Sequence, residues 1–385
     1  MLNFEFHNPT RIVFGQGKVA DLARLVPQAA RVLVLYGGES ARRTGTLAEV
    51  RAALGERSVS EFGGIEPNPS YETLMRAVAQ VRAENIDYLL AVGGGSVIDG
   101  TKFVAAAACF DGEPWDILLQ RGRNVQRALP LASVLTLPAT GSEMNNGGVV
   151  TRKATQAKLS FSSAHCFPQF SVLDPTKTYT LPREQIANGL VDAYVHIMEQ
   201  YLTYPVQARP QDRFAEGLLQ TLVEIAPGAL AEPPDYDHRA NLMWTATLAL
   251  NGLIGAGVPQ DWATHMIGHE LTALYGIDHA RTLAIVLPSL MQSQRAAKRD
   301  KLLQYAERVW HVSGGTEDER IDAAITHTRA FFESVGIPTR LSAYGLGREA
   351  VDAVVAQLTA HGMLKLGEHR AITPEVSRAI LEAAL

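Results

Sequence analysis

The chain contains two pairs of side chains that could bind a metal ion, and the members of each pair are four residues apart. His265 and His269 lie in the stretch THMIGHE, and Asp192 and His196 lie in VDAYVH. Residues four apart share one face of an α-helix. His279 follows in YGIDHARTLAI. One carboxylate and several imidazoles are a suitable ligand set for a divalent transition metal.

The spacing of these histidines leaves three interpretations open. They could bind a metal, carry protons near neutral pH, or pack in a core with ordinary hydrogen bonds. The pattern is not that of an H-E-x-x-H zinc protease, because Glu270 follows His269 instead of standing between the histidines.

A second chemical signal is a glycine-rich turn in LLAVGGGSVIDGTKFVAAA. A buried strand runs into Gly93, Gly94 and Gly95, where bare backbone allows a pyrophosphate to approach closely. Ser96 is the expected N-cap of the next helix, with Asp99 three positions beyond it. The free N–H groups at that helix start predict phosphate binding. The alternative is a plain strand-to-helix turn.

Another stretch, FGQGKVADL, also fits a dinucleotide pattern, G-x-G-x-x-A. Its members are Gly15, Gly17 and Ala20, and Glu39 follows about twenty residues on. A lone match of this kind is weak evidence, and a structural turn is the favoured interpretation.

The elements that position these residues change in character along the chain. The first half alternates apolar strand-like runs, such as RVLVLYGG and IDYLLAVGGG, with helical patterns such as YETLMRAVAQVRAEN. This alternation predicts a Rossmann-like parallel sheet with helices on both faces. Long helical patterns follow after Thr180. We expect an α/β dinucleotide-binding domain over residues 1–180 and an all-helical metal-binding, catalytic domain over 181–385.

Composition limits the class of protein. The chain has 385 residues, a formal net charge of −5 and two cysteines. Without a basic stripe, nucleic acid is not an expected partner. No run of about 18 apolar residues and no signal-peptide pattern occurs, so we expect no membrane partner and a cytoplasmic location.

Four motifs together give a resemblance to a known family. GGGSVIDGTK, TLPATGSE, DAYVHIMEQY and HMIGHELTALYGIDHARTLAI resemble, in this order, the iron-containing (group III) alcohol dehydrogenase family. The similarity covers nearly the whole chain and is greatest to the branch of NADPH-dependent aldehyde reductases and butanol dehydrogenases. It implies a dehydroquinate synthase-like architecture with an α/β nucleotide domain, an all-helical metal domain and an active site in the cleft between them.

The resemblance also implies roles for individual residues. The metal ligands would be Asp192, His196, His265 and His279, holding Zn²⁺ or Fe²⁺. His269 would be the catalytic residue that handles the proton or positions the substrate. The cofactor would contact Gly94, Gly95, Ser96, Asp99, Thr136, Leu137 and Thr140, with Lys158 near a ribose. The FGQGKVA stretch becomes a structural turn.

The strand end LVLYGGESARRTG is expected to meet the adenosine ribose of the cofactor. NAD-using relatives carry an aspartate at the position that aligns with Gly37, and that charge would repel a 2′-phosphate. Room for the phosphate, a hydrogen-bond donor and positive charge are expected here from Gly37, Gly38, Ser40, Arg42 and Arg43. The stretch therefore favours NADP(H), although Glu39 could weaken the discrimination. A solvated turn is the alternative for the two arginines.

The expected activity is the reversible, metal-dependent reduction of short-chain aldehydes to alcohols by NADPH. The alternatives are a lyase of the dehydroquinate synthase type and a non-enzymatic nucleotide-binding or metal-binding protein. Trp262 and Phe161 are candidates for lining the substrate pocket, with ordinary packing as the alternative. The alternating N-terminal stretch FEFHNPTRIVFG is expected to form a strand, and its pairing across a two-fold axis would give a homodimer.

Overall fold

The computed structural model describes residues 1–385 and divides into two compact units. The sheet unit comprises residues 7–182 and 234–247, and the helical unit comprises residues 1–6, 183–233 and 248–385. Each unit therefore includes a piece of chain that is distant in sequence from the rest of that unit. The contiguous domains expected over residues 1–180 and 181–385 stay a prediction.

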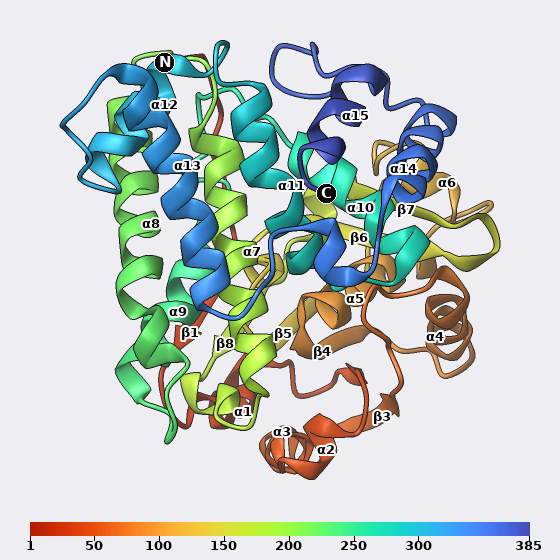
Figure 1. Cartoon of the computed structure of the whole chain (residues 1–385). Coiled ribbons are helices and arrows are strands. Elements are labelled where there is room, and N and C mark those ends of the chain that lie inside the picture. The colour runs from red at the N-terminus through yellow and green to blue at the C-terminus, as the bar shows by residue number, and fades with distance from the viewer. The chain divides into compact units, whose positions relative to one another are not determined.

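Six parallel strands form the core of the sheet unit, in the order β1-β8-β5-β4-β2-β3 (Figure 1). They are β1 (Arg11–Phe14), β2 (Arg31–Tyr36), β3 (Ser58–Phe62), β4 (Tyr88–Gly94), β5 (Leu131–Leu137) and β8 (Phe170–Leu173). The predicted Rossmann-like parallel sheet is thus confirmed. A separate antiparallel pair joins β6 (Gly147–Arg152) and β7 (Ala157–Ser162).

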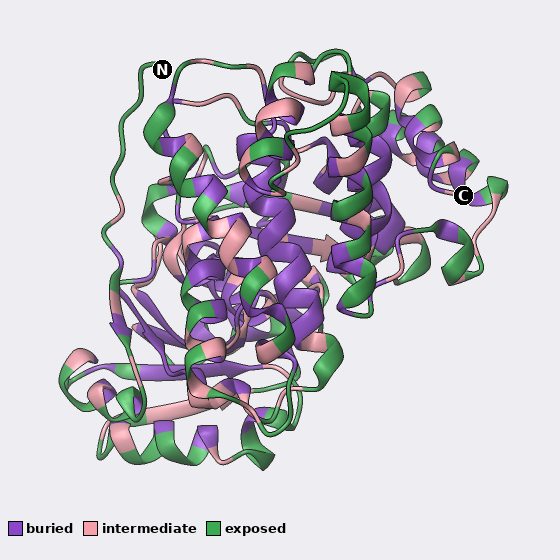
Figure 2. Cartoon of the chain, turned by 60° about the vertical axis from the view of Figure 1, so that its left-hand side comes forward, coloured by how far each residue is buried: buried purple, intermediate pink, exposed green.

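The helices of this unit cover both faces of the sheet because strand residues alternate between two apolar cores. Leu33 and Leu35 of β2 pack in one core, and Val32 and Val34 pack in the other. Figure 2 shows the strands as largely buried ribbons. The helices are α1 (Leu22–Leu25), α2 (Ser40–Arg43), α3 (Thr46–Leu54), α4 (Tyr71–Ala83), α5 (Gly95–Ala108), α6 (Asp116–Leu119) and α9 (Tyr236–Ala249). The core with Leu33 includes residues of α4 and α5, and the core with Val32 includes residues of α1 and α3.

The N-terminal strand is shorter than the alternation of the sequence predicts. Only Arg11–Phe14 pairs with the sheet, whereas Phe4 and Phe6 lie outside any strand and are exposed. Pro9 has no N–H to donate to a strand ladder, and the Asn8 side chain accepts a hydrogen bond from the Thr10 N–H. The expected strand therefore begins only after this local turn.

A buried lysine fixes the chain between β5 and β6 onto α5. Lys102 Nζ donates to Ser142 Oγ at 2.8 Å, to Asn145 Oδ1 at 2.9 Å and to the Gly147 carbonyl at 2.7 Å. Burial lowers the pKa of Lys102 to about 8. Three acceptors from one short segment hold it against the helix that begins at Gly95.

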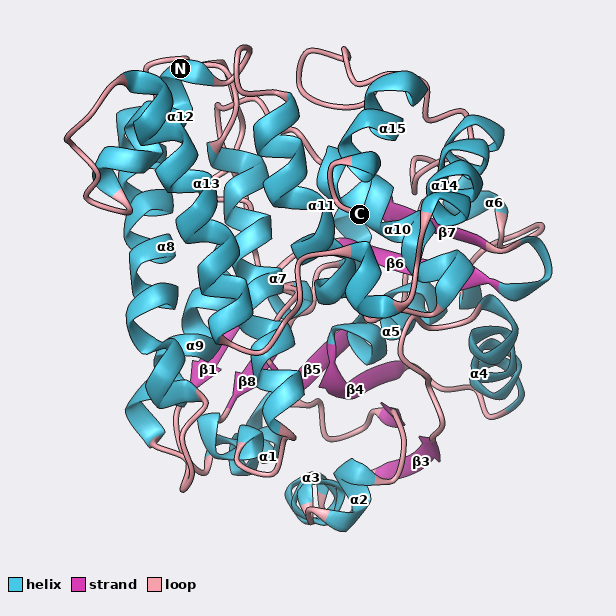
Figure 3. Cartoon of the chain, viewed as in Figure 1, coloured by secondary structure: helices cyan, strands magenta, loops and turns pink.

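The helical unit has no strands, as Figure 3 makes clear. Its helices are α7 (Arg183–Tyr201), α8 (Arg209–Ala229), α10 (Ala263–Tyr275), α11 (His279–Ser293), α12 (Arg299–Arg308), α13 (Glu317–Ser334), α14 (Arg348–Ala360) and α15 (Pro374–Glu382). One apolar cluster includes residues of α10, α11, α14 and α15. All residues of α7 from Ile186 to Tyr201 are buried. None of the chain's helices has the length and apolar character needed to cross a membrane.

Candidate functional site

Three helices of the helical unit supply the predicted metal ligands. Asp192 and His196 lie on α7, His265 lies in the first turn of α10, and His279 is the first residue of α11. Gly276, at a φ of 67°, ends α10 three residues before α11 begins. Left-handed backbone of this kind suits glycine. This short turn joins the end of α10 to the start of α11.

The side chains converge on a single carboxylate oxygen. Asp192 Oδ1 lies 3.6 Å from Nε2 of His196, 4.0 Å from Nε2 of His265 and 3.8 Å from Nε2 of His279. The rings of His196 and His265 stack, with their centroids 4.7 Å apart. Asp192, His196 and His265 are buried, and His279 is half-buried. Asp192, His265 and His279 offer ligand atoms that all lie within 4.8 Å of one another, whereas His196 approaches this group through Asp192.

These distances fit a shared metal ion better than they fit hydrogen bonds. A tetrahedral ion about 2.1 Å from each ligand separates the ligand atoms by about 3.4 Å. The separations from Asp192 Oδ1 to the three nitrogens, 3.6–4.0 Å, exceed the usual hydrogen-bond range but approach this tetrahedral edge. Asp192 Oδ1 is buried without a hydrogen bond. The donor set of one carboxylate and three imidazoles suits Zn²⁺ or Fe²⁺.

His269 lies beside this cluster without joining its centre. Its ring centroid is 5.2 Å from that of His279 and 6.2 Å from that of His265. The imidazoles that approach Asp192 Oδ1 within 4.0 Å are the other three. His269 is buried, one turn beyond His265 on α10. His269 is therefore a neighbour of the cluster.

Glu199 is a buried contact of the cluster that the sequence analysis missed. Its Oε2 bonds to Nδ1 of His265, the ring nitrogen opposite the one that faces Asp192. Burial and the negative charge of Asp261 raise the pKa of Glu199. Its spacing was a usable signal, because residues 192, 196 and 199 share one face of α7.

The two proposed pocket-lining aromatic residues have different surroundings. Trp262, the N-cap of α10, has a left-handed φ of 64°, which is rare for a bulky residue and occurs more often at functional sites. Its ring centroid is 5.2 Å from that of His265. Phe161 is instead buried in the sheet unit and packs edge-to-face on Phe103. Packing is the role that the structure gives to Phe161.

The predicted cofactor residues gather at the carboxyl ends of three adjacent strands. Gly37 and Gly38 follow β2, Gly94 ends β4, and Leu137 ends β5. From β2 the chain goes first to the edge strand β3 and then back to β4 on the other side. Such a reversal of strand order opens a crevice that binds ligands in parallel α/β sheets.

The glycine turn differs in one detail from the expected geometry. Gly94, and not Ser96, is the N-cap of α5, which already begins at Gly95. A Cβ on Gly95 would lie 2.4 Å from the Thr140 side chain, and a Cβ on Gly94 would lie 3.0 Å from Leu137 Cβ. Neither position therefore has room for a larger side chain without a shift of its neighbour. The Ser96 hydroxyl instead accepts a hydrogen bond from the Asn68 N–H.

Asp99 and Lys158 contact protein groups in this structure. Asp99 Oδ1 accepts from Ser142 Oγ at 2.5 Å, and Oδ2 accepts from the Val149 N–H at 2.9 Å. Burial raises the pKa of Asp99. Lys158 Nζ donates to Asn68 Oδ1 at 2.8 Å. Asn68, which the sequence analysis also missed, therefore joins Lys158 to the glycine turn.

The remaining predicted cofactor residues lie around these. Thr136, near the end of β5, and Thr140 are half-buried, whereas Gly38 and Ser40 are exposed. Gly37 is half-buried, and a Cβ there would lie 3.3 Å from the Ile65 carbonyl oxygen.

Arg42 is engaged by protein carboxylates. Its guanidinium lies 3.2 Å from Glu61 Oε2 and 3.7 Å from Glu39 Oε2, and it also bonds to the Tyr36 hydroxyl. The expectation that Arg42 offers a positive charge to a phosphate is therefore weakened by Glu61, which lies far from it in sequence. Arg43 is exposed and its side chain makes no ion pair.

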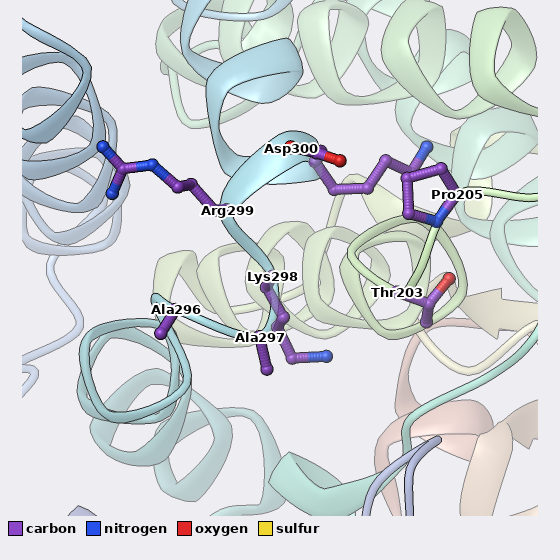
Figure 4. A pocket seen from close by; sticks show the side chains of 8 residues that line it. Thr203, Pro205, Ala296, Ala297, Lys298, Arg299 and Asp300 are labelled. Atoms are coloured by element: carbon purple, nitrogen blue, oxygen red, sulfur yellow. The ribbon is translucent and has the colours of Figure 1, made fainter.

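Two hollows of the helical unit are lined by residues other than the predicted ligands. One, of about 90 Å³, is lined by residues around the start of α12 (Figure 4). The other, of about 300 Å³, is lined by residues of the 366–372 segment together with Gln294, Ala297 and Lys298. Lys298, which lines both, is paired with Asp261 and Glu368. Neither hollow is lined by His269 or by one of the four predicted ligands.

Comparison with known proteins identifies the class. The model of the family "Iron-containing alcohol dehydrogenase" matches residues 9–175, and that of the "Fe-containing alcohol dehydrogenase family, C-terminal" matches residues 186–385. The chain belongs to the iron-containing alcohol dehydrogenase family.

Individual relatives refine the comparison. The NADPH-dependent aldehyde reductase YqhD of Escherichia coli (strain K12) is 60% identical over 100% of both chains. A probable NADH-dependent butanol dehydrogenase 1 of Bacillus subtilis (strain 168) is 40% identical, also over 100% of both chains. A solved structure of the E. coli protein matches with a TM-score of 0.99, 60% identity, and coverage of 100% of this chain and 99% of that one. The predicted family, branch and fold are confirmed.

The close approach at Gly95 yields a test of the glycine turn. We expect Gly95→Ala to lower the free energy of unfolding by about 1–3 kcal/mol, because the new methyl group displaces Thr140. We also expect weaker binding of a dinucleotide. Urea unfolding and fluorescence titration measure the two effects.

Gly217→Ala on α8 is the matched control for this change. A Cβ there meets no atom within 4 Å, so we expect a gain in stability of about 0.5–1 kcal/mol. Equal behaviour of the two variants would contradict the steric argument.

Proposed function

We propose that this protein catalyses the reversible, metal-dependent reduction of short-chain aldehydes to alcohols with NADPH. The observation that carries the proposal is the convergence of three imidazoles on the buried Asp192 carboxylate. The 60% identity to an NADPH-dependent aldehyde reductase over the full chain supports the reaction and the cofactor. The relatives give no support to a lyase or to a non-enzymatic protein.

Asp192, His196, His265 and His279 would hold one Zn²⁺ or Fe²⁺ ion. Such an ion, when bound, polarises a carbonyl group and stabilises the negative charge that develops on its oxygen. The burial of the ligand side chains excludes water from one side of the site, which strengthens electrostatic interactions there. The stacked rings of His196 and His265 restrict each other's orientation.

The glycine turn, the end of β2 and the end of β5 would bind NADP(H). The cofactor supplies the hydride. Gly94 and Gly95 allow close approach of the pyrophosphate, and the N-terminus of α5 offers it unpaired N–H groups and a partial positive charge. Further contacts are proposed for Gly37, Gly38, Ser40, Ser96, Asp99, Thr136, Leu137, Thr140 and Lys158.

His269 would deliver the proton that the alcohol oxygen needs. Its ring lies beside His265 and His279, within reach of a substrate held at the cluster. Imidazole can donate a proton near neutral pH. Trp262 would bound the substrate at the start of α10.

A cytoplasmic location is proposed with this function. Its support is that both cysteines, Cys109 and Cys166, are free thiols.

The ligand assignment predicts different outcomes for two histidines of one helix. We expect His265→Ala to lose its bound metal and nearly all turnover, because it removes a ligand. His269→Ala should keep its metal and lose roughly 10²–10⁴-fold in rate, because it removes only a proton carrier. Metal content by mass spectrometry and aldehyde reduction with NADPH, measured on the same samples, test both. Full metal occupancy in His265→Ala, or metal loss in His269→Ala, would overturn the assignment.

The cofactor assignment predicts a change of preference on adding charge after β2. We expect the parent protein to prefer NADPH and Gly37→Asp to lose that preference, because the carboxylate repels a 2′-phosphate. Gly37→Asn is the control, because asparagine has nearly the same size as aspartate and no charge. In both variants the new Cβ lies 3.3 Å from the Ile65 carbonyl oxygen. The ratio of kcat/KM for NADPH and NADH is the measurement. An equal shift in both variants would show that space, and not charge, decides.

We further propose that the chain forms a homodimer through its N-terminal segment. Met1, Leu2, Phe4 and Phe6 are between 44% and 52% exposed, and four large apolar side chains within six residues are typical of a contact surface. A second copy of the chain is the proposed occupant.

The homodimer can be tested by the mass of the protein in solution. We expect a dimer for the parent chain and monomers for the double variant Phe4→Ser, Phe6→Ser, because its contact surface is made polar. Phe214→Ser on α8 removes another exposed phenylalanine, 50% exposed, and should stay dimeric. Sedimentation velocity distinguishes these outcomes, and a parent chain that sediments as a monomer would contradict the proposal.

A further inference from the structure

Glu199 contacts His265 on the side opposite the proposed metal. One edge of the imidazole, Nε2, faces Asp192 Oδ1 at 4.0 Å, while Nδ1 bonds to Glu199 Oε2. Both partners are buried, with 5% of His265 and 2% of Glu199 exposed. The ring is thus held between two carboxylates of the same helix, α7.

The second oxygen of Glu199 is used as well. Oε1 accepts hydrogen bonds from the Thr264 N–H at 2.7 Å and the His265 N–H at 3.4 Å. These N–H groups belong to the first turn of α10, where they have no partner within their own helix. One side chain of α7 therefore caps α10 and orients the first histidine of that helix.

The chemistry of the imidazole makes this contact important for metal binding. A neutral histidine carries its proton on one ring nitrogen, and only the other nitrogen has a lone pair for a metal. A carboxylate that accepts a hydrogen bond from Nδ1 fixes the proton there. Partners of this kind orient histidine ligands and raise their basicity, and their removal typically costs 10–100-fold in metal affinity.

We propose that Glu199 is a positioning residue of the metal site, which holds His265 in its Nδ1–H tautomer and so directs the Nε2 lone pair toward the ion. This inference rests on the proposed metal site and deepens it. Glu199 touches neither substrate nor cofactor in this role and acts only through His265.

The Glu199 carboxylate has no lysine or arginine partner and bonds to His265, because the nearby Lys298 pairs with other groups. Asp261, whose N–H donates to the Glu199 carbonyl at 2.9 Å, is the acid whose negative charge acts on Glu199. Asp261 has its own cation, because Lys298 Nζ lies 2.8 Å from its Oδ2. Lys298 also pairs with Glu368 and the Leu202 carbonyl. The lysine is thus shared among other acceptors, and the Glu199 side chain bonds only to α10.

Glu199→Gln is the decisive variant because it preserves the size of the side chain. The amide oxygen can still accept from the N–H groups of Thr264 and His265. The amide nitrogen then faces Nδ1 and donates to it, which favours the tautomer with its proton on Nε2. We expect the affinity for Zn²⁺ to fall about 10–100-fold. Competition with a chromophoric chelator measures this affinity without reference to turnover.

A second readout is the visible absorption spectrum of the Co²⁺-substituted protein. We expect the spectrum of Glu199→Gln to differ from that of the parent chain, because the geometry at the ion changes when Nε2 is no longer presented. A merely structural role for Glu199 would lower stability and leave the spectrum of the bound Co²⁺ unchanged.

The same helix provides a matched control. Glu270 of α10 is also a buried carboxylate bonded to an imidazole, with its Oε1 2.8 Å from Nδ1 of His361. His361 is not one of the cluster residues. We expect Glu270→Gln to keep the parent's Zn²⁺ affinity and Co²⁺ spectrum, even where stability falls.

A shorter carboxylate distinguishes charge from size. Glu199→Asp keeps the acceptor but loses one methylene, so we expect its Zn²⁺ affinity to lie between those of the parent and Glu199→Gln. Equal affinities in the parent chain and Glu199→Gln, or a Gln variant that binds more tightly than the Asp variant, would overturn the inference.

A measurement on the parent chain keeps the inference falsifiable if a variant does not fold. In Zn²⁺-loaded protein with ¹⁵N-labelled histidine, the nitrogen signals of His265 should show a proton on Nδ1, with assignment by comparison of the histidine variants. A proton on Nε2 of His265 would overturn the proposal. A parent chain that binds no metal would instead refute the proposed metal site itself.

Discussion

The buried carboxylate of Asp192 is the constraint on which the centre of the helical unit depends. A carboxylate inside a protein is unfavourable unless cations or hydrogen bonds compensate its charge. Asp192 Oδ1 has three imidazoles around it at 3.6–4.0 Å and no hydrogen bond. In the function proposed above, a divalent cation at their centre would compensate the charge of this carboxylate. Residues of α7, α10 and α11 therefore meet at one buried charge.

The helix that carries Asp192 also organises its neighbours. Residues 192, 196 and 199 form one face of α7, and they provide two proposed ligands and the carboxylate that caps α10. Asn188 extends this face by a hydrogen bond of 3.1 Å to Asp278, just before α11 begins. The starts of both ligand-bearing helices are thereby attached to α7. The Glu199 contact is buried and directional, and it therefore fixes the position of His265. The Asn188 contact is made to an exposed residue, Asp278.

The sheet unit uses backbone proximity for a similar purpose. The first residue of α5 lies so close to the chain after β5 that a Cβ on Gly95 would lie 2.4 Å from the Thr140 side chain. Hydrogen bonds from Lys102 and to Asp99, both on α5, hold the segment from Ser142 to Val149. A bare backbone turn at the carboxyl edge of a parallel sheet is a site for phosphate groups. The hydrogen bonds of Lys102 and Asp99 restrict the conformation of the chain next to that turn.

The sequence by itself determined the parallel sheet and the helical second half, because apolar periodicity is a local property. The i, i+4 spacing offered two candidate pairs, and the resemblance to a family implied which residues would be ligands. The sequence placed the N-cap of α5 at Ser96, whereas Gly94 is the N-cap and the Ser96 hydroxyl bonds to the Asn68 N–H, a partner 28 residues away. It also assigned Arg42 a free charge, which the distant Glu61 engages. The Glu199–His265 contact joins positions 66 residues apart. Only the tertiary structure decides such pairs, because a partner's distance in space does not follow from its distance along the chain.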